Sequence, residues 1–172
     1  CTGLNQQEKK SPSWFNLTEI EIVVDYVRKL QEYGQRRGIG LADIGIISPY
    51  SRQVQKVREA LDLKKLEGPK VGSCEQFQGE ERRVIIISTV RSSLEYVQSD
   101  EKFNIGFLNN PKRFNVAVTR AKAMVIVVGN PAVLASDPSW SRLLWHCVGK
   151  FSLTAYIFYR HYVVNLLYYL VM

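Results

Sequence analysis

One continuous apolar segment, Val84–Val90 (VIIISTV), constrains the fold of this chain more than any other feature. Strands buried on both faces have such unbroken apolar runs, and they occur in parallel sheets that helices cover on both sides. The segments Ile44–Ser48 and Met124–Val128 have the same character, and Lys70–Cys74 is predicted to be a briefer strand. The chain is therefore expected to contain a buried parallel sheet.

Segments with helical periodicity alternate with these strands. Helices are predicted over residues 17–34, 50–61 and 112–121, and shorter ones begin at Asn130-Pro131 and Asp137-Pro138. This alternation is typical of stacked βα units. We therefore predict an α/β fold in which a three-layer parallel sheet is flanked by helices.

The helix over residues 17–34 has a start signal of its own. Asn16 is followed three residues later by Glu19, the spacing at which a cap and its reciprocal partner occur. We expect Asn16 to accept from the helix backbone and Glu19 to bond back to the backbone of Asn16.

The domain is expected to span residues 1–149, with residues 150–172 as a divergent apolar tail. Phe151–Met172 is marginally long enough to cross a membrane, but Arg160 and His161 lie near its middle, where charge is costly. This argues against a membrane span. A buried terminal segment, or a chain end that does not fold with the domain, fits the pattern better. Residues 92–110 are polar and are predicted to form a loop.

Composition narrows the class of protein. A hydrophobic content of 46% and a charged content of 23% exclude a largely disordered chain. The net charge of +7 favours a polyanionic partner, although spare surface lysines would produce the same total. The three cysteines form no CxxC pattern, so no metal site is expected and a reducing compartment is indicated. The chain begins with Cys1 and carries no signal peptide at its start, as expected of a piece of a longer protein.

Chemistry in parallel α/β sheets gathers at the carboxyl ends of the strands. By that rule, we expect functional residues in Ser48-Pro49-Tyr50, in the Gln76–Glu81 loop and in the turn after Val128. Tyr50, Arg52 and Gln53 stand where a strand passes into a helix, and a helix N-terminus favours anions. A nucleotide or RNA contact is one interpretation of that corner, and a plain strand-to-helix turn is the other.

The segment Pro111–Lys122 (PKRFNVAVTRAK) has an apolar stripe at helical spacing that includes Phe114 and Ala117. Arg113 and Arg120 are seven residues apart, so we expect both on one edge of that helix, about 10.5 Å apart along its axis. The planar fork of arginine suits phosphate. Solvated surface arginines are the alternative for this pair.

The loop before Val84 places Gln78, Gly79 and Glu81 between two predicted strands. Polar side chains at such a turn are able to approach a sugar or a phosphate, and a solvated turn is the alternative. Adjacent carboxylates in an extended loop point apart, and arginines follow them immediately, so a metal site is not expected here.

Three segments in this order and spacing resemble motifs IV, V and VI of superfamily 1B helicases: GIISPYSRQV, VGSCEQFQGEERRVIIISTVRSS and LNNPKRFNVAVTRAKAMVIVVGNP. They are most similar to the Armitage/Moloney-leukaemia-virus-10 group, which includes the silencing-defective RNA helicases of plants. The resemblance covers about residues 11–148, and the joint occurrence of three motifs is highly specific. It implies the second RecA-like domain of a P-loop NTPase, with ATP in the cleft between two such domains and single-stranded RNA across the top.

The resemblance also implies roles for individual residues. Arg120 matches the arginine that reaches the γ-phosphate from the second domain, and Gln78 and Arg113 complete the expected catalytic set. The expected nucleotide-binding residues are Gly79, Glu81, Gln53, Arg52 and Tyr50. The expected RNA-binding residues are Ser73, Pro49, Ser48 and Thr89.

Two departures from the family pattern limit what the chain is expected to do alone. It has no GxxxxGK[ST] loop and no acidic Walker B strand, so ATP and Mg²⁺ would be held mainly by an upstream helicase motor domain. Some relatives have an arginine where this chain has Val54, and the likeness ends near Gly149.

The resulting expectation is half of an ATP-dependent RNA helicase that acts in RNA silencing or RNA turnover. Its expected partners are single-stranded RNA, the upstream motor domain and RNA-silencing proteins, with no membrane. The expected location is the cytoplasm, including RNA granules. A non-catalytic RNA-binding scaffold and a DNA-directed superfamily 1 helicase are the alternatives.

Overall fold

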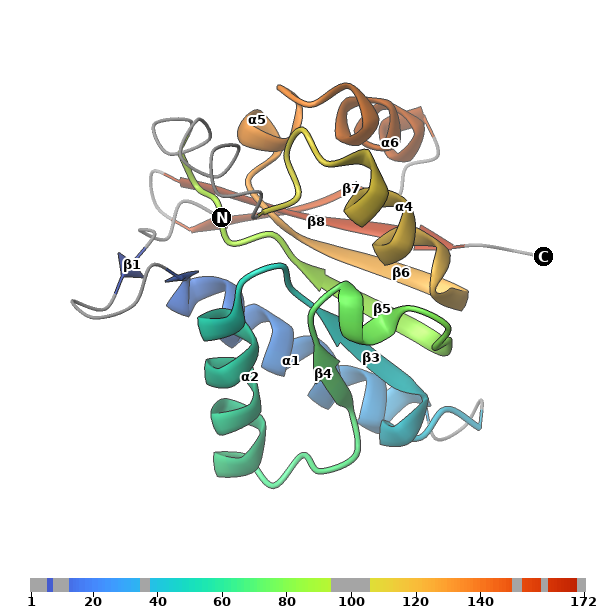
Figure 1. Ribbon diagram of the computed structural model, residues 1–172. Helices are drawn as coiled ribbons and strands as arrows, with labels where there is room; N and C mark the ends of the chain where they lie inside the picture. The colour runs from blue at the N-terminus through green and yellow to red at the C-terminus, as the bar shows by residue number, and fades with distance from the viewer. Residues whose placement is uncertain are drawn as a thin grey trace.

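The computed structural model describes residues 6–7, 13–34, 38–93, 106–149, 153–158 and 161–169, with the backbone alone described beyond Cys147. Six strands form one sheet (Figure 1). In spatial order they are β4 (Lys70–Gly72), β3 (Ile44–Ile47), β5 (Arg82–Ser88), β6 (Ala121–Gly129), β8 (His161–Tyr169) and β7 (Leu153–Phe158). The first four are parallel to one another. The predicted parallel sheet is therefore confirmed.

Helices cover both faces of this sheet, which confirms the predicted three layers (Figure 1). One face carries α1 (Leu17–Gly34) and α2 (Ser51–Leu63). The other carries α4 (Pro111–Thr119), α5 (Pro131–Leu134) and α6 (Pro138–Gly149). Two short 3₁₀ helices follow the same chain: η2 (Leu41–Asp43) lies between α1 and β3, and η3 (Glu75–Phe77) lies between β4 and β5. A separate pair of strands consists of β1 (Gln6–Gln7) and β2 (Trp14–Phe15).

Strand β5 has a different core on each of its faces. Val84 and Ile86 pack against α1 and α2, whereas Ile85 and Ile87 pack towards α4 and α6. All four side chains are fully buried. An unbroken apolar run is what a strand needs when alternate side chains enter two separate cores.

The chain end was expected to be a buried terminal segment or an end that does not fold with the domain, and its described backbone forms two strands of the sheet. Strand β8 runs antiparallel to β6, with Ile126 opposite Leu167, and β7 pairs with β8 in turn. Among the described residues, no helix has the length and apolarity needed to cross a bilayer. The middle of the predicted 92–110 loop, residues 94–105, lies outside the described residues.

The three helix starts predicted from Asn and Asp are confirmed. Asn130 accepts a hydrogen bond from the backbone of Ala132, and Asp137 accepts from Ser139 and Trp140. Asn16 accepts from the Glu19 backbone, as expected of a cap.

The predicted bond between the Glu19 side chain and the Asn16 backbone is wrong. The backbone of Asn16 donates to Gln53 Oε1 at 2.9 Å, and the Glu19 carboxylate turns into the protein. There it accepts from the Ser88 hydroxyl at 2.6 Å and from the Val90 backbone at 2.9 Å. The Ser88 hydroxyl also accepts a hydrogen bond from the side-chain amide of Gln53 at 2.8 Å. A buried polar network thus joins α1, α2 and the end of β5.

Burial has a measurable consequence for Glu19. It raises the pKa of this carboxyl from 4.5 to about 7, and the hydrogen bonds from Ser88 and Val90 offset only part of that increase. Between these two pH values the folded chain binds more protons than the unfolded chain. The free energy of unfolding therefore decreases as the pH rises through this range, and the stabilisation is fully present only below about pH 4.5.

We predict that Glu19→Gln, a neutral isostere, stabilises the chain by about 2 kcal/mol at pH 8 and changes little at pH 4.5. The measurement is urea unfolding across this pH range. Glu21→Gln, which removes the same charge from the exposed side of α1, is the control and should follow wild type. If the free energy of unfolding changes with pH equally in Glu19→Gln and in wild type, the raised pKa of Glu19 is contradicted.

Candidate nucleotide-binding site

The parallel pairing of β5 with β6 brings two of the predicted functional segments together. Arg82, the first residue of β5, lies opposite Ala121, the first residue of β6. The Arg82 backbone N–H donates to the carbonyl of Arg120 at 3.0 Å. The loop that precedes β5 and the arginine that precedes β6 therefore meet at the amino edge of the sheet, which is defined here as residues 78–82 together with 119–122.

This placement corrects the expectation for the Gln76–Glu81 loop, which was assigned to the carboxyl end of a strand. Strand β4 ends at Gly72, and η3 then leads the chain back towards the start of β5. A connection between two parallel strands of one sheet, here β4 and β5 with β3 between them, must return to the opposite edge of the sheet. The second half of this connection, Gln78–Glu81, therefore lies at the amino edge.

Arg120 is the residue that caps the C-terminal end of α4. Its side chain is half-buried, and its guanidinium donates to the Thr119 hydroxyl at 3.0 Å. Its Nε is buried without a hydrogen-bond partner. Within the part of the chain that the structure describes, Arg120 makes no ion pair. A guanidinium that no carboxylate neutralises at an open sheet edge is available to an anion.

The helix predicted over residues 112–121 spans Pro111–Thr119. It ends at Thr119, since the chain has to enter the ladder between β6 and β5 at Ala121. Arg113 lies in the first turn of α4, where its backbone donates to the Asn110 cap. Its side chain bonds to Glu75, and that of Arg120 bonds to Thr119. The common edge expected for the two arginines stays a prediction.

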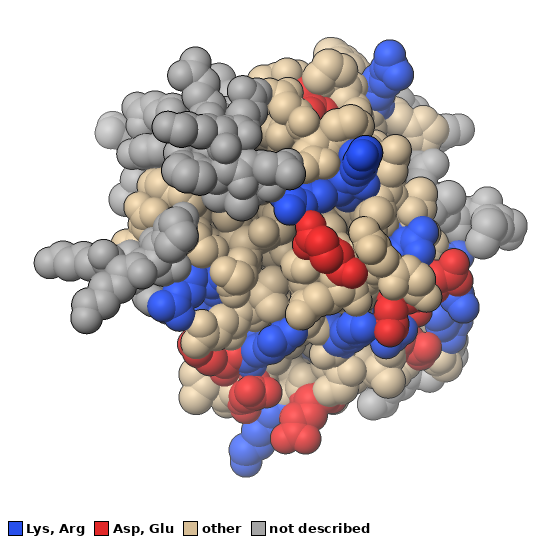
Figure 2. Space-filling model, in the orientation of Figure 1, with Lys and Arg blue, Asp and Glu red and all other residues tan. Residues whose placement is uncertain are grey.

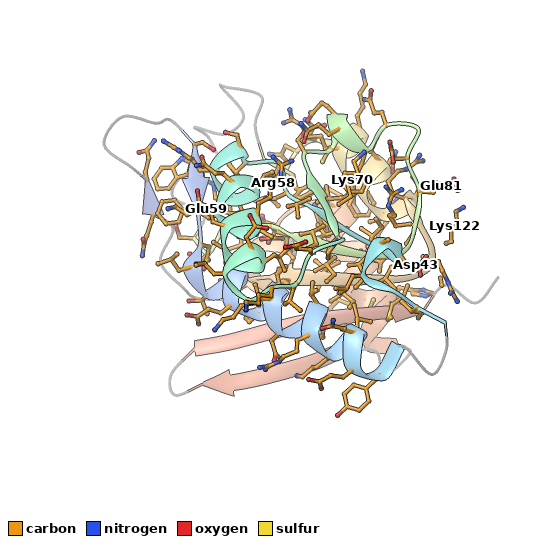
Figure 3. The ribbon with its side chains drawn as sticks, turned by 90° about the horizontal axis from the view of Figure 1, so that it is seen from below. Asp43, Arg58, Glu59, Lys70, Glu81 and Lys122 are labelled. Carbon is orange, nitrogen blue, oxygen red and sulfur yellow. The ribbon has the colours of Figure 1, made fainter. Side chains whose placement is uncertain are left out.

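The Gln78–Glu81 loop combines a left-handed glycine with ion pairs. Gly79 has a φ of +75°, in the left-handed region that favours glycine. Glu80 pairs with Lys70 and Arg82, and Glu81 lies 3.4 Å from the Nζ of Lys122. Figure 3 shows Glu81 and Lys122 together at one side of the domain, away from Glu59 on α2.

An open pocket of about 200 Å³ lies between η3 and α4. Gln78 and Arg113, both expected to be catalytic, line it together with Glu75 and Lys112. Basic and acidic side chains alternate on this face of the molecule (Figure 2). The Gln78 side chain is exposed and makes no hydrogen bond to the described residues. The pocket therefore offers a guanidinium, an ammonium and an amide to a ligand.

Cys74 also lines this pocket, but it is not a reactive thiol. Burial, assisted by the neighbouring Glu75 carboxylate, raises the pKa of Cys74 to about 12. The thiol is therefore protonated at neutral pH, and thiolate chemistry is excluded at this position. Among the described residues, no group of His, Cys, Asp or Glu side chains is arranged to hold a metal ion.

The remaining predicted residues lie at the opposite, carboxyl edge of the sheet. Ser48, Tyr50 and Thr89 are almost fully buried there, and the Ser48 hydroxyl has no hydrogen-bond partner. The Tyr50 hydroxyl accepts from Arg91 Nε at 3.0 Å. Pro49 is half-buried beside them. The structure therefore divides the predicted residues between two edges.

Three further predicted residues make local contacts at this edge. Arg52 donates to Gln55 at 2.7 Å, and its backbone donates to Ser13. Gln53 is completely buried in the Asn16–Ser88 network, where its amide joins α1 to β5. The Ser73 hydroxyl accepts from the backbone of Gln76 and so caps η3.

Sequence reasoning missed two residues of the carboxyl edge, Arg91 and Trp14. The buried Arg91 guanidinium lies 4.5 Å from the ring centre of Trp14 and 5.4 Å from that of Tyr50. It fixes both aromatic rings through cation–π contacts. No periodicity reveals such a contact, because the three residues come from separate segments.

The missed Glu19 did carry a signal. It precedes Val23 and Val27 at intervals of four residues, so it belongs to the apolar stripe of α1. A lone carboxylate on an apolar stripe indicates a buried polar contact.

Comparison with known proteins identifies the class to which this fold and site belong. The AAA domain family matches residues 1–132. Two proteins named as helicases, mov-10-B.1 of Danio rerio and MOV-10 of Gallus gallus, are 51% and 55% identical over 90% and 84% of this chain. The protein named RNA helicase Mov10l1 of Homo sapiens is 48% identical over 85% of it. The chain spans 16% of the length of the first two relatives and 12% of the third. It therefore belongs to the AAA domain family, within the superfamily 1B RNA helicases of the MOV-10 and Armitage group.

We predict that Gly79→Ala lowers the free energy of unfolding of the chain by about 1 kcal/mol. The cause is its left-handed backbone alone, since an added Cβ meets no atom within 4 Å. Gly79→Asn should cost less, because asparagine tolerates this region better than alanine. Chemical denaturation of both variants tests this, and equal losses, or no loss for alanine, would show that the loop relaxes.

Proposed function

We propose that the chain is the C-terminal motor half of an ATP-dependent RNA helicase that acts on single-stranded RNA. Its amino edge and the η3–α4 pocket would face nucleotide held mainly by an upstream motor domain, which would supply the P-loop and the Mg²⁺ ligands. The observation that carries this proposal is the guanidinium of Arg120, which no described carboxylate neutralises, beside the Gln78–Glu81 loop.

The residues of the amino edge and of the η3–α4 pocket fit a nucleotide polyphosphate. Arg120 and Arg113 both offer planar forks suited to phosphate oxygens, and Lys112 adds an exposed point charge. The role proposed for Arg120 is to stabilise charge that develops on the γ-phosphoryl group during transfer. ATP would supply that phosphoryl group, and the residues of this chain would hold it in the one orientation that the transfer needs.

The carboxyl edge is the proposed RNA side. Pro49 and Ser73 are partly exposed where the parallel strands end, and contacts there would recognise sugar and phosphate with little base preference. Ser48 and Thr89, also expected to bind RNA, are almost fully buried and would support this edge from within. The positive net charge supports such binding. The relatives named as RNA helicases favour RNA over DNA as the substrate. A role in RNA silencing or turnover, and a cytoplasmic location, belong to the same proposal.

We predict that Arg120→Ala, made in the full-length protein, lowers ATP turnover by about 10³-fold while RNA affinity stays within a few-fold of wild type. Arg142→Ala on the exposed surface of α6 is the matched control and should retain full turnover. The measurements are steady-state ATP hydrolysis and RNA binding by fluorescence anisotropy. Turnover within a few-fold of wild type in Arg120→Ala would remove Arg120 from the catalytic role.

We also predict that single-stranded RNA stimulates ATP hydrolysis by the full-length protein at least about tenfold more than DNA of the same sequence. RNA binding should weaken steeply as salt rises, because phosphate contacts dominate. Equal stimulation by the two nucleic acids would favour the DNA-directed alternative. Binding without any stimulation would favour a non-catalytic scaffold.

A further inference from the structure

The η3–α4 pocket contains an acidic residue to which neither the motif pattern nor the proposed function gives a role. Glu75 accepts a hydrogen bond from Arg113 Nε at 2.8 Å. The two residues are 38 positions apart, and they come from η3 and the first turn of α4. The Arg113 side chain is only 19% exposed, whereas Glu75 is 53% exposed. The carboxylate therefore lies over a largely enclosed guanidinium.

The geometry of this contact restricts the guanidinium. Because the group is planar, a carboxylate bonded at Nε fixes both its plane and its direction. Glu75 is not bonded to the two terminal nitrogens of Arg113, and one of them also lies 3.5 Å from the Gly106 carbonyl. The helix cap at Asn110 fixes the backbone of Arg113. The side chain is thus held at both ends.

Charge and geometry predict opposite effects for Glu75. The carboxylate adds negative charge to a pocket that otherwise carries Lys112 and Arg113. On charge alone, removing it would strengthen binding of a phosphate. On geometry, removing it would release Arg113 from its fixed direction and slow a reaction that needs that direction. The two effects are therefore separable by experiment.

We propose that Glu75 is a positioning residue that holds the Arg113 guanidinium in the direction needed to meet a nucleotide phosphate in the η3–α4 pocket. The inference rests on the proposed function, since it assigns Arg113 to phosphate. It adds that Arg113 is effective only while Glu75 orients it.

The test is ATP hydrolysis by the full-length protein carrying Glu75→Gln, with kcat and KM measured separately. We expect kcat to decrease by about tenfold and KM for ATP to change by less than about threefold. Glu75→Asp, which keeps the carboxylate, should recover most of the lost kcat. Glu67→Gln removes the same charge from an exposed position outside both the pocket and the amino edge, and it should behave like wild type. An unchanged kcat with a lowered KM in Glu75→Gln would overturn the proposal in favour of a pure charge effect.

A second arm separates this proposal from the proposed function. In an Arg113→Lys background, which keeps the charge but lacks the fork, Glu75→Gln should cause no further loss of kcat. An equal loss of kcat in the wild-type and the Arg113→Lys backgrounds would show that Glu75 acts through a residue other than Arg113.

If Arg113→Ala retains full turnover, the proposed role of Arg113 itself fails. If Arg113→Ala loses turnover and a folded Glu75→Gln does not, only the positioning role fails. Circular dichroism establishes folding, and a normal kcat in Glu75→Asp together with its loss in Glu75→Gln supports positioning.

Discussion

The amino edge of this domain depends on the parallel pairing of β5 with β6. That ladder begins at Arg82 and Ala121, so the residues that precede the two strands are brought to one place. The bond from the Arg82 N–H to the Arg120 carbonyl joins the two segments where the chain enters these strands. The ladder thereby sets where the Arg120 guanidinium emerges. A shift of one residue in this register would turn every side chain of β6 to the other face.

The two faces of the sheet carry different features of the domain. The face covered by α1 and α2 contains the buried network of Asn16, Glu19, Gln53 and Ser88, which joins the first helix to the end of β5. The face covered by α4 carries the η3–α4 pocket. A side chain such as Gln53, which the motif pattern places near nucleotide, is used here to tie structural elements together. Its burial and its hydrogen bonds to Asn16 and Ser88 make it a connector between the carboxyl edge and the core.

The sequence predicted the layers, the parallel strands and the helix caps, because these follow from local periodicity and from residues adjacent in the chain. Val84–Val90 is one example, and the Asn130 and Asp137 caps are others. It did not predict contacts between distant segments. The bond from Arg113 to Glu75, the stacking of Arg91 on Trp14 and the inward turn of Glu19 each join residues that no spacing rule relates.

The central claim is that Arg120 reaches across an interdomain gap to the terminal phosphate of bound nucleotide. A structure of the full-length protein with single-stranded RNA and a transition-state mimic, ADP with aluminium fluoride, tests it most directly. The account predicts that an Arg120 terminal nitrogen leaves the Thr119 hydroxyl and lies about 3 Å from a fluoride of the mimic. If the guanidinium stays on Thr119 while the mimic is bound elsewhere, the account is contradicted.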